Sequence, residues 1–127
     1  MSQPTYLYKI LADAPPAPLP ESLALSGLDQ KDGFIHLSIA KQTPLTARMF
    51  FANHRELWVL RVSRGKLDGR IEWFTEPTYK IEGGCPHLHE SAKGLGRDNV
   101  AEVIHVARQT DEDWAETEGM KRVLEDE

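Results

Sequence analysis

The chain has 127 residues and a formal net charge of −5 at pH 7, from 15 lysines and arginines against 20 aspartates and glutamates. Its length predicts one domain with a modest core, and its acidic balance argues against a general nucleic-acid-binding protein. No apolar run reaches the roughly 18 residues of a transmembrane helix, no secretory signal opens the chain, and the one cysteine, Cys85, cannot form an internal disulfide, so we expect a cytoplasmic protein without a membrane partner.

The first predicted elements are a strand and a proline-rich connection. Residues 5–11 alternate weakly between polar and apolar and predict a strand. Residues 12–20 contain four prolines, which predicts an extended connection without regular structure. Residues 23–28 follow as a short strand or a turn.

A histidine and a serine lie inside the next apolar run. The Asp-Gly pair at 32–33 predicts a turn, and residues 34–39 predict a strand. Since side chains alternate along a strand, one face carries Phe34, His36 and Ser38, and the apolar residues between them face the core. Such a display of polar groups on a rigid element suits a binding or catalytic floor. The alternative is that His36 is a hydrogen-bonded histidine in a half-buried strand.

A helix is predicted after this strand. Thr43 can cap it, Pro44 takes its first position, and its end is expected near residues 53–54. Phe50 and Phe51 point about 100° apart on a helix, so only one of them can lie squarely in the core while the other lines a pocket wall. The apolar stripe of the helix is predicted to consist of Leu45, Met49, Ala52 and Phe50.

The second half of the chain predicts mostly strands. Predicted strands cover residues 56–62, 70–74, 85–89 and 100–107, with turns or loops at 65–68, 75–84 and 91–98. Strands outnumber helices, and most connections are too short for βαβ crossovers. We therefore expect an α+β fold with a mainly antiparallel sheet, bent or split into two layers, and one or two packed helices.

The chain is predicted to end in an acidic helix. Thr110 can cap it, and the acids that follow lie at the positive end of the helix dipole. Residues 111–127 hold eight acids and two bases, a net charge of −6, so residues 1–110 sum to +1. We expect a near-neutral α+β domain over residues 1–110, with the acidic helix of residues 111–127 packed on it or extending from it.

The sequence resembles the DUF952 family, which is named for its unknown function. The resemblance is carried by residues 32–38 (Asp-Gly-Phe-Ile-His-Leu-Ser), Gln42, residues 46–51 and residues 86–89 (Pro-His-Leu-His), and it runs from about Tyr6 to Val106. The family is grouped by fold with the ADP-ribosyltransferase-like proteins, whose split β-structure holds NAD. The resemblance thus implies this fold and makes NAD a candidate substrate, with no other cofactor indicated.

The resemblance also implies two catalytic roles. His36 resembles, by its order along the chain, the residue that supports the NAD ribose in these transferases. Glu76 resembles their late glutamate, which stabilises an oxocarbenium-like transition state. Glu72 competes with Glu76 for this role, because the register after Trp73 differs from the family's pattern. The alternative is that both glutamates are solvated.

Further residues are predicted to bind a ligand, namely Phe34, Ser38, Gln42, Thr46 and His87. Ser38, Gln42 and the amides at the start of the helix would hold a phosphate or a carboxylate, or would only cap the helix. His87 would hydrogen-bond a ligand, or it would be a structural histidine.

A metal site is considered and rejected. Cys85, His87 and His89 alternate along one strand, and with His36 they offer zinc ligands. Their spacing lacks the paired ligands of structural zinc sites, and the family pattern usually has an aromatic residue where this chain has His89. We therefore predict no metal.

Three functions remain open at this point. The first is an ADP-ribosyltransferase-like enzyme that binds NAD or a related nucleotide in a pocket lined by histidine and serine. The second is a non-catalytic module that binds a small ligand in the same pocket. The third is an interaction domain whose acidic helix, residues 111–127, binds a basic protein partner.

Overall fold

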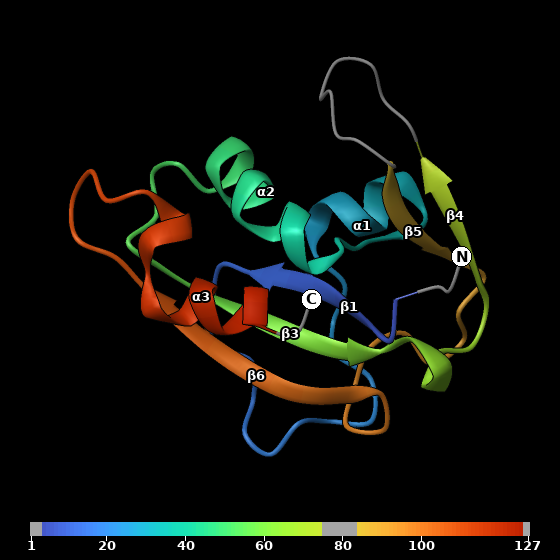
Figure 1. Cartoon of the computed structure of the whole chain (residues 1–127). Helices are drawn as coiled ribbons and strands as arrows, with labels where there is room; N and C mark the ends of the chain where they lie inside the picture. The colour runs from blue at the N-terminus through green and yellow to red at the C-terminus, as the bar shows by residue number, and fades with distance from the viewer. Residues whose placement is uncertain (1–3, 75–83, 126–127) are drawn as a thin grey trace.

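The computed structural model describes residues 4–74 and 84–125, which form two three-stranded antiparallel sheets and three short helices (Figure 1). The strand order is β1-β3-β6 in the first sheet and β2-β5-β4 in the second. The elements are β1 (Tyr6–Leu11), α1 (Gly27–Asp32), β2 (Ile35–His36), α2 (Thr43–Phe50), β3 (Glu56–Ser63), β4 (Arg70–Phe74), β5 (Cys85–His89), β6 (Val100–Ala107) and α3 (Glu118–Glu125). The predicted α+β class, with a mainly antiparallel and split sheet, is confirmed.

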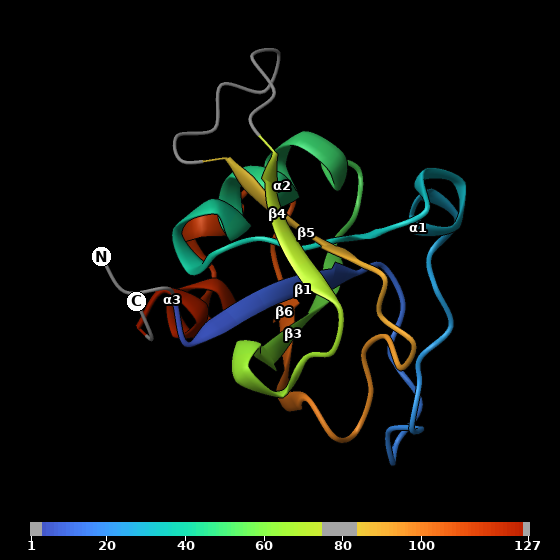
Figure 2. The ribbon, with the colours of Figure 1, turned by 90° about the vertical axis from the view of Figure 1, so that its right-hand side faces the viewer.

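The central strand of the first sheet, β3, is buried on both faces. Leu57 and Val59 point to one side and pack in a cluster with Ala47 of α2 and side chains of α3. Leu60 and Val62 point to the other side and pack in a second cluster with residues of β2 and β5. The first sheet therefore lies between helices α2 and α3 on one face and the second sheet on the other. Figure 2 views the second sheet from outside, with β4 crossing in front of β1.

The two sheets are joined where β1 meets the segment after β2. The N–H of Tyr8 donates to the carbonyl of Ser38 at 2.7 Å, and the N–H of Ser38 donates to the carbonyl of Tyr8 at 2.8 Å. The single strand predicted over residues 34–39 is therefore wrong, because Ile35–His36 pairs with β5 while Ser38 pairs with the other sheet. The chain changes sheets within this run.

Helix α1 was not predicted, and the expected strand or turn at residues 23–28 is wrong. The side chain of Ser26 caps the helix by accepting from the N–H of Asp29 at 3.1 Å. Gly33 ends it in the left-handed conformation at φ 80°, which glycine adopts without strain. The Asp-Gly pair thus ends a helix instead of forming a hairpin turn. The signal was weak because the helix is short and mostly polar.

Helix α2 differs from its prediction in its ends and its buried face. A 3₁₀ turn precedes it, so Thr43 is its first residue and not its cap, and it ends at Phe50 and not near residues 53–54. Its buried face consists of Thr43, Pro44 and Ala47, whereas Met49 and Phe50 are exposed. The predicted stripe is wrong because small residues on α2 allow close approach to the sheet, which leaves the larger ones outside.

The C-terminal helix begins later than expected. Thr117, and not Thr110, caps α3, since its Oγ1 accepts from the N–H of Met120 at 3.2 Å. Trp114, Met120 and Val123 are buried in the cluster under β3. A partner that binds residues 111–125 would therefore contact the exposed side chains of this segment and not these three. None of the described helices is long and apolar enough to cross a membrane.

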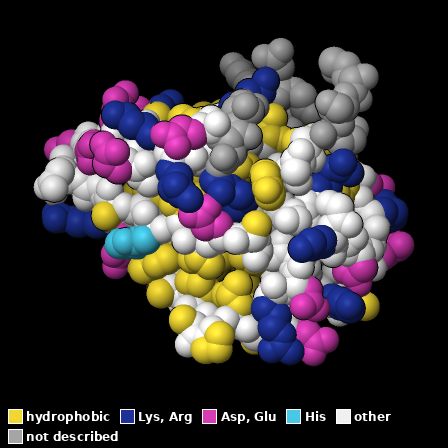
Figure 3. All heavy atoms as spheres, turned by 60° about the horizontal axis from the view of Figure 1, so that its bottom comes forward, with side chains coloured by type: hydrophobic (Ala, Val, Ile, Leu, Met, Phe, Trp, Pro, Cys, Tyr) yellow, Lys and Arg dark blue, Asp and Glu magenta, His cyan; other side chains and the backbone are white. Residues whose placement is uncertain are grey.

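The connection after β1 has no regular structure, as predicted for residues 12–20. It lies on the lower side of the molecule in Figure 1, and Figure 3 shows hydrophobic side chains gathered on that face among charged ones. From there the chain rises to α1, so this connection spans from the first sheet to the edge of the second.

Candidate functional site

The second sheet presents a row of ionisable side chains on one face. His87 of β5 pairs with His36 of β2 and with Glu72 of β4. Directly opposed residues point to the same side of a sheet, so these three side chains share one face. The ring of Phe34, just before β2, lies 4.7 Å from the rings of both His36 and His89 and belongs to the same face.

This face opens into a cleft of about 1520 Å³, which we call the histidine cleft. Its other walls come from α1, α2 and the connection after β1. Besides the three histidines, it is lined by Phe34, Ser38, Thr46, Phe50, Trp73 and Phe74. Phe50 and Phe74 are 51% and 48% exposed, which is unusual for rings of this size. The cleft is thus a concave site with aromatic walls and a few polar groups, as small-molecule sites are.

His87 is the buried histidine at the floor of this cleft. It is 8% exposed, and its imidazole stacks with Phe34 at 4.4 Å and Phe74 at 5.3 Å between ring centroids. Burial, together with His36 and His89 nearby, lowers the pKa of His87 to about 4, so the ring is neutral at pH 7. Its ring nitrogens have no hydrogen-bond partner among the described residues, which leaves a donor and an acceptor for a ligand.

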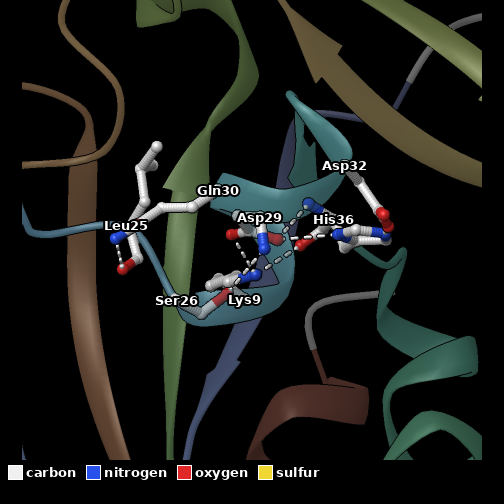
Figure 4. Close-up of polar contacts among 7 residues, drawn as sticks. All are labelled: Lys9, Leu25, Ser26, Asp29, Gln30, Asp32 and His36. Carbon is white, nitrogen blue, oxygen red and sulfur yellow. Dashed lines mark hydrogen bonds and ion pairs between the residues drawn. The ribbon is translucent and has the colours of Figure 1, made fainter.

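Beside this row, a buried carboxylate joins three elements (Figure 4). Asp29 of α1 is 2% exposed, and its Oδ2 accepts from the Nζ of Lys9 in β1 at 2.7 Å. Its Oδ1 accepts from the backbone N–H of His36 at 3.2 Å and lies 2.7 Å from the Nδ1 of that residue. Lys9 also donates to the carbonyl of His36 at 3.1 Å. This carboxylate therefore fixes β1, α1 and β2 relative to one another.

The pKa values at this carboxylate reflect burial and pairing together. Burial alone would raise the pKa of Asp29, but the hydrogen bond from His36 and the charge of Lys9 outweigh it, so the pKa lies below its ordinary value. Burial lowers the pKa of Lys9, and the charge of Asp29 opposes this effect. The Nζ of Lys9 keeps two oxygen acceptors within hydrogen-bonding distance, as a buried ammonium requires.

His36 lies between two carboxylates. Its Nδ1 faces Asp29, and its Nε2 lies 3.0 Å from the Oδ2 of Asp32. A neutral imidazole carries one N–H, so only the protonated ring can donate to both acids at once. Asp32 is partly exposed at the edge of the cleft, so a ligand that displaces it gains access to Nε2. The arrangement can hold a ligand hydroxyl or transfer a proton.

The structure brings together five of the residues expected to form the site, namely Phe34, His36, Ser38, Thr46 and His87. Ser38 and Thr46 contact each other, with their hydroxyl oxygens 3.2 Å apart. Both hydroxyls therefore lie at the junction of the second sheet and α2, where they can meet the same ligand.

Gln42 was expected in the same site, but it is not among the lining residues. Its amide donates to the carbonyl of Gly84 at 2.6 Å and accepts from the N–H of Ile39 at 3.0 Å. With 3% exposure, this side chain holds the backbone in place and is not presented to a ligand.

The structure describes one of the two glutamates that compete for the catalytic role. Glu76 lies outside the residues that the structure describes, whereas Glu72 lines the cleft and lies 3.0 Å from the Nε2 of His89.

Within residues 4–74 and 84–125, no group of three or more histidine, cysteine, aspartate or glutamate side chains is arranged to hold a metal ion.

Sequence reasoning missed Lys9 and Asp29. A lysine between Leu7 and Leu11 on the inward face of a strand is a signal for a buried acidic partner, although the sequence does not say which acid. The spacing of Ser26 and Asp29 is typical of a helix start and could have indicated α1. Only the tertiary fold brings these residues to His36.

Comparison with known proteins gives a family and a fold. A family model described as "Protein of unknown function (DUF952)" matches residues 17–103. No curated protein matches the chain. The crystal structure of protein CC0527 from Caulobacter crescentus is similar, with 24% sequence identity, 94% of this chain and 99% of that chain covered, and a TM-score of 0.69. A double mutant of CC0527 aligns with 23% identity and the same TM-score of 0.69. At this identity the likeness shows the fold alone.

We predict that His87 makes the protein less stable at mildly acidic pH. Its pKa is about 4 in the folded protein and 6.5 in its ordinary state, so the unfolded chain binds the proton first and stability declines as the pH falls from 6.5 to 4. The lowered pKa of Asp29 contributes only at lower pH. Between pH 7 and pH 5, the free energy of unfolding of the wild type, measured with urea, should fall by about 2 kcal/mol more than that of His87→Phe, whose ring cannot titrate. Parallel declines would contradict this assignment.

Proposed function

The chain belongs to the DUF952 family, and from the geometry of the histidine cleft we propose that it binds a small molecule with a planar ring. The first candidate is NAD or a related nucleotide, as the grouping of the family with ADP-ribosyltransferase-like proteins suggests. The proposed ligand is a small molecule and not a nucleic acid.

One observation carries this proposal. His87 is a buried polar side chain that faces the cleft without a hydrogen-bond partner among the described residues. A ligand that displaces water from the ring nitrogens of His87 without replacing its hydrogen bonds loses about 1–3 kcal/mol, so the cleft favours a ligand with hydrogen-bonding groups. A ligand that both donates and accepts hydrogen bonds, such as a carboxamide or a nucleobase edge, satisfies this imidazole best.

The aromatic side chains around His87 favour a planar ligand. Phe34 already stacks on the imidazole, and Phe74 lies nearly parallel to it at an interplanar angle of 22°. Phe50 and Trp73 expose large apolar surfaces at the cleft, at 51% and 37%. Rings gain about 0.5–1.5 kcal/mol from aromatic pairing beyond the area that they bury, so a ring inserted here is bound with specificity.

We predict that a ligand with a planar ring raises the melting temperature and that His87→Phe removes the effect. NAD, ADP-ribose, nicotinamide and simple nucleotides form the first screen, measured by thermal shift. A ligand at a hundred times its dissociation constant adds about 2.7 kcal/mol, a shift of several degrees for a domain of this size. His87→Phe keeps the stacking and removes the polar atoms, so binding should fall while the fold persists.

The control for this variant is His105→Phe, which makes the same change at an exposed position of β6 that pairs with Glu56. It should keep the full ligand response. An equal response from wild type and His87→Phe would refute the role of His87, and silence of the wild type toward every ring-bearing ligand would refute the proposal as a whole.

A second candidate function is ribosyl transfer at the same cleft. Its support is the position of Glu72, which is directly opposite His87 and lines the cleft on the same face as His36. In this candidate, a carboxylate stabilises the cation that develops on the ribose as the bond to nicotinamide breaks. Water as the acceptor gives ADP-ribose and nicotinamide. Glu72 is then the described residue that takes the role first assigned to Glu76.

We predict that, if the cleft is catalytic, Glu72→Gln lowers nicotinamide release from NAD by about 100-fold or more, because the amide cannot stabilise a developing cation. Release is measured by chromatography after incubation with purified protein. Binding of NAD without release would leave the cleft as a non-catalytic binding site, and full activity of Glu72→Gln would exclude Glu72 as the acting carboxylate.

A further inference from the structure

We propose that the histidine cleft selects a positively charged nitrogen group, either a cationic nitrogen heterocycle or an organic ammonium, held by Asp32 and the surrounding aromatic rings. This inference rests on the proposed binding function and adds the charge of the ligand group that enters the cleft. The cleft should therefore bind a cationic ring more tightly than a neutral ring of the same shape.

The charged residues that line the cleft are mostly acids. Apart from the three histidines, the described lining residues include three carboxylates, from Asp13, Asp32 and Glu72, against one amine, from Lys9, and no arginine. Low-dielectric walls strengthen the field of such groups on a ligand between them. The cleft therefore attracts cations more than anions, although the described chain outside the C-terminal segment is close to neutral.

The one amine of the lining is already engaged. Lys9 donates to Asp29 at 2.7 Å and to the carbonyl of His36 at 3.1 Å, and its side chain is 11% exposed. Moving it to a phosphate would leave the buried carboxylate of Asp29 without its cation, which is strongly unfavourable. A phosphate group seated among the described lining residues would thus face carboxylates without a cation to pair with.

Asp32 is the acid best placed to meet a cation. Its Oδ2 faces the Nε2 of His36 at 3.0 Å, while its Oδ1 has no partner among the described residues. Asp32 is 33% exposed at the edge of the cleft, so it is accessible to a ligand and only partly screened by water. Glu72 is the weaker candidate, since Arg70 and His89 already contact its carboxylate.

The floor of the cleft around His87, which is lined by aromatic rings, also favours a cationic ligand. This histidine is more than nine-tenths buried, faces the cleft without a partner among the described residues, and is neutral at pH 7, so it offers a hydrogen bond without repelling a cation. The rings of Phe34, Phe50 and Phe74 line the same space. A cation over the face of an aromatic ring is attracted by the quadrupole of that ring. Aromatic faces, an acid and a neutral hydrogen-bonding group together fit a cationic ring.

The acids of the cleft favour the cationic ring of a nicotinamide nucleotide over its phosphates. The oxidised nicotinamide ring is a planar cation with a carboxamide, and the carboxamide matches the donor and acceptor of His87. The phosphates of the same molecule carry the opposite charge and would stay away from Asp32. A free cationic ring should therefore bind as well as, or better than, a whole nucleotide that carries it.

The experiment compares 1-methylnicotinamide, methylated on the ring nitrogen, with nicotinamide by isothermal titration calorimetry on the full chain. The two share the ring and the carboxamide, and the former carries a positive charge. We expect the cation to bind about tenfold more tightly. Asp32→Asn should remove most of this difference by weakening the cation about fivefold or more, while leaving nicotinamide within about twofold. Asp32→Ser, which also removes the carboxylate, is measured in the same way if Asp32→Asn does not fold, and it should weaken the cation to the same extent.

Glu90→Gln is the matched control, because it removes one exposed carboxylate near Arg70 that is not part of the lining. It should leave both affinities unchanged. Equal or tighter binding of nicotinamide would overturn the charge inference while the ring-binding function stands. Failure of both compounds, together with silence of the wider ring-bearing screen, would overturn the inference and the proposed function together.

Discussion

The arrangement of the cleft depends on the ion pair and hydrogen bonds of the buried Asp29 carboxylate. This carboxylate receives the ammonium of Lys9 from β1 and both the backbone N–H and the ring of His36 from β2, while it belongs to α1. Burying a charged group costs several kcal/mol of solvation free energy, and its partners offset this cost only while they stay in place. The first sheet, the second sheet and α1 are therefore held in one geometry at the point where the cleft opens.

This constraint explains why the two histidines of the row have different properties. Asp29 fixes the ring of His36 through Nδ1, and Asp32 faces its other nitrogen. His87, one strand further, has no acid within hydrogen-bonding distance among residues 4–74 and 84–125 and lies between aromatic rings, so it stays neutral and available to a ligand. The paired histidine is a rigid wall of the cleft, and the unpaired histidine is the group that a ligand must satisfy.

The sequence predicted those parts of the molecule that local patterns decide. Alternation and apolar content located β1, β3 and β6, and the order of Phe34, His36 and Ser38 located one wall of the cleft. Local pattern could not show that the run from Phe34 to Ile39 changes sheets, because Ser38 is paired by the distant Tyr8. The partnership of Lys9 with Asp29 was hidden for the same reason. A single acid among many is chosen only by the tertiary fold, and a short polar helix gives little periodic signal.

Asp29 and Lys9 act as one buried unit that holds the cleft together, and a double-mutant cycle measures their coupling. Urea unfolding of wild type, Lys9→Met, Asp29→Asn and the double variant gives the coupling free energy between the two side chains. We expect a coupling of about 2 kcal/mol or more, because each single change leaves the other group buried without its partner. Additive effects within about 0.5 kcal/mol would contradict it and show that the two groups contribute independently.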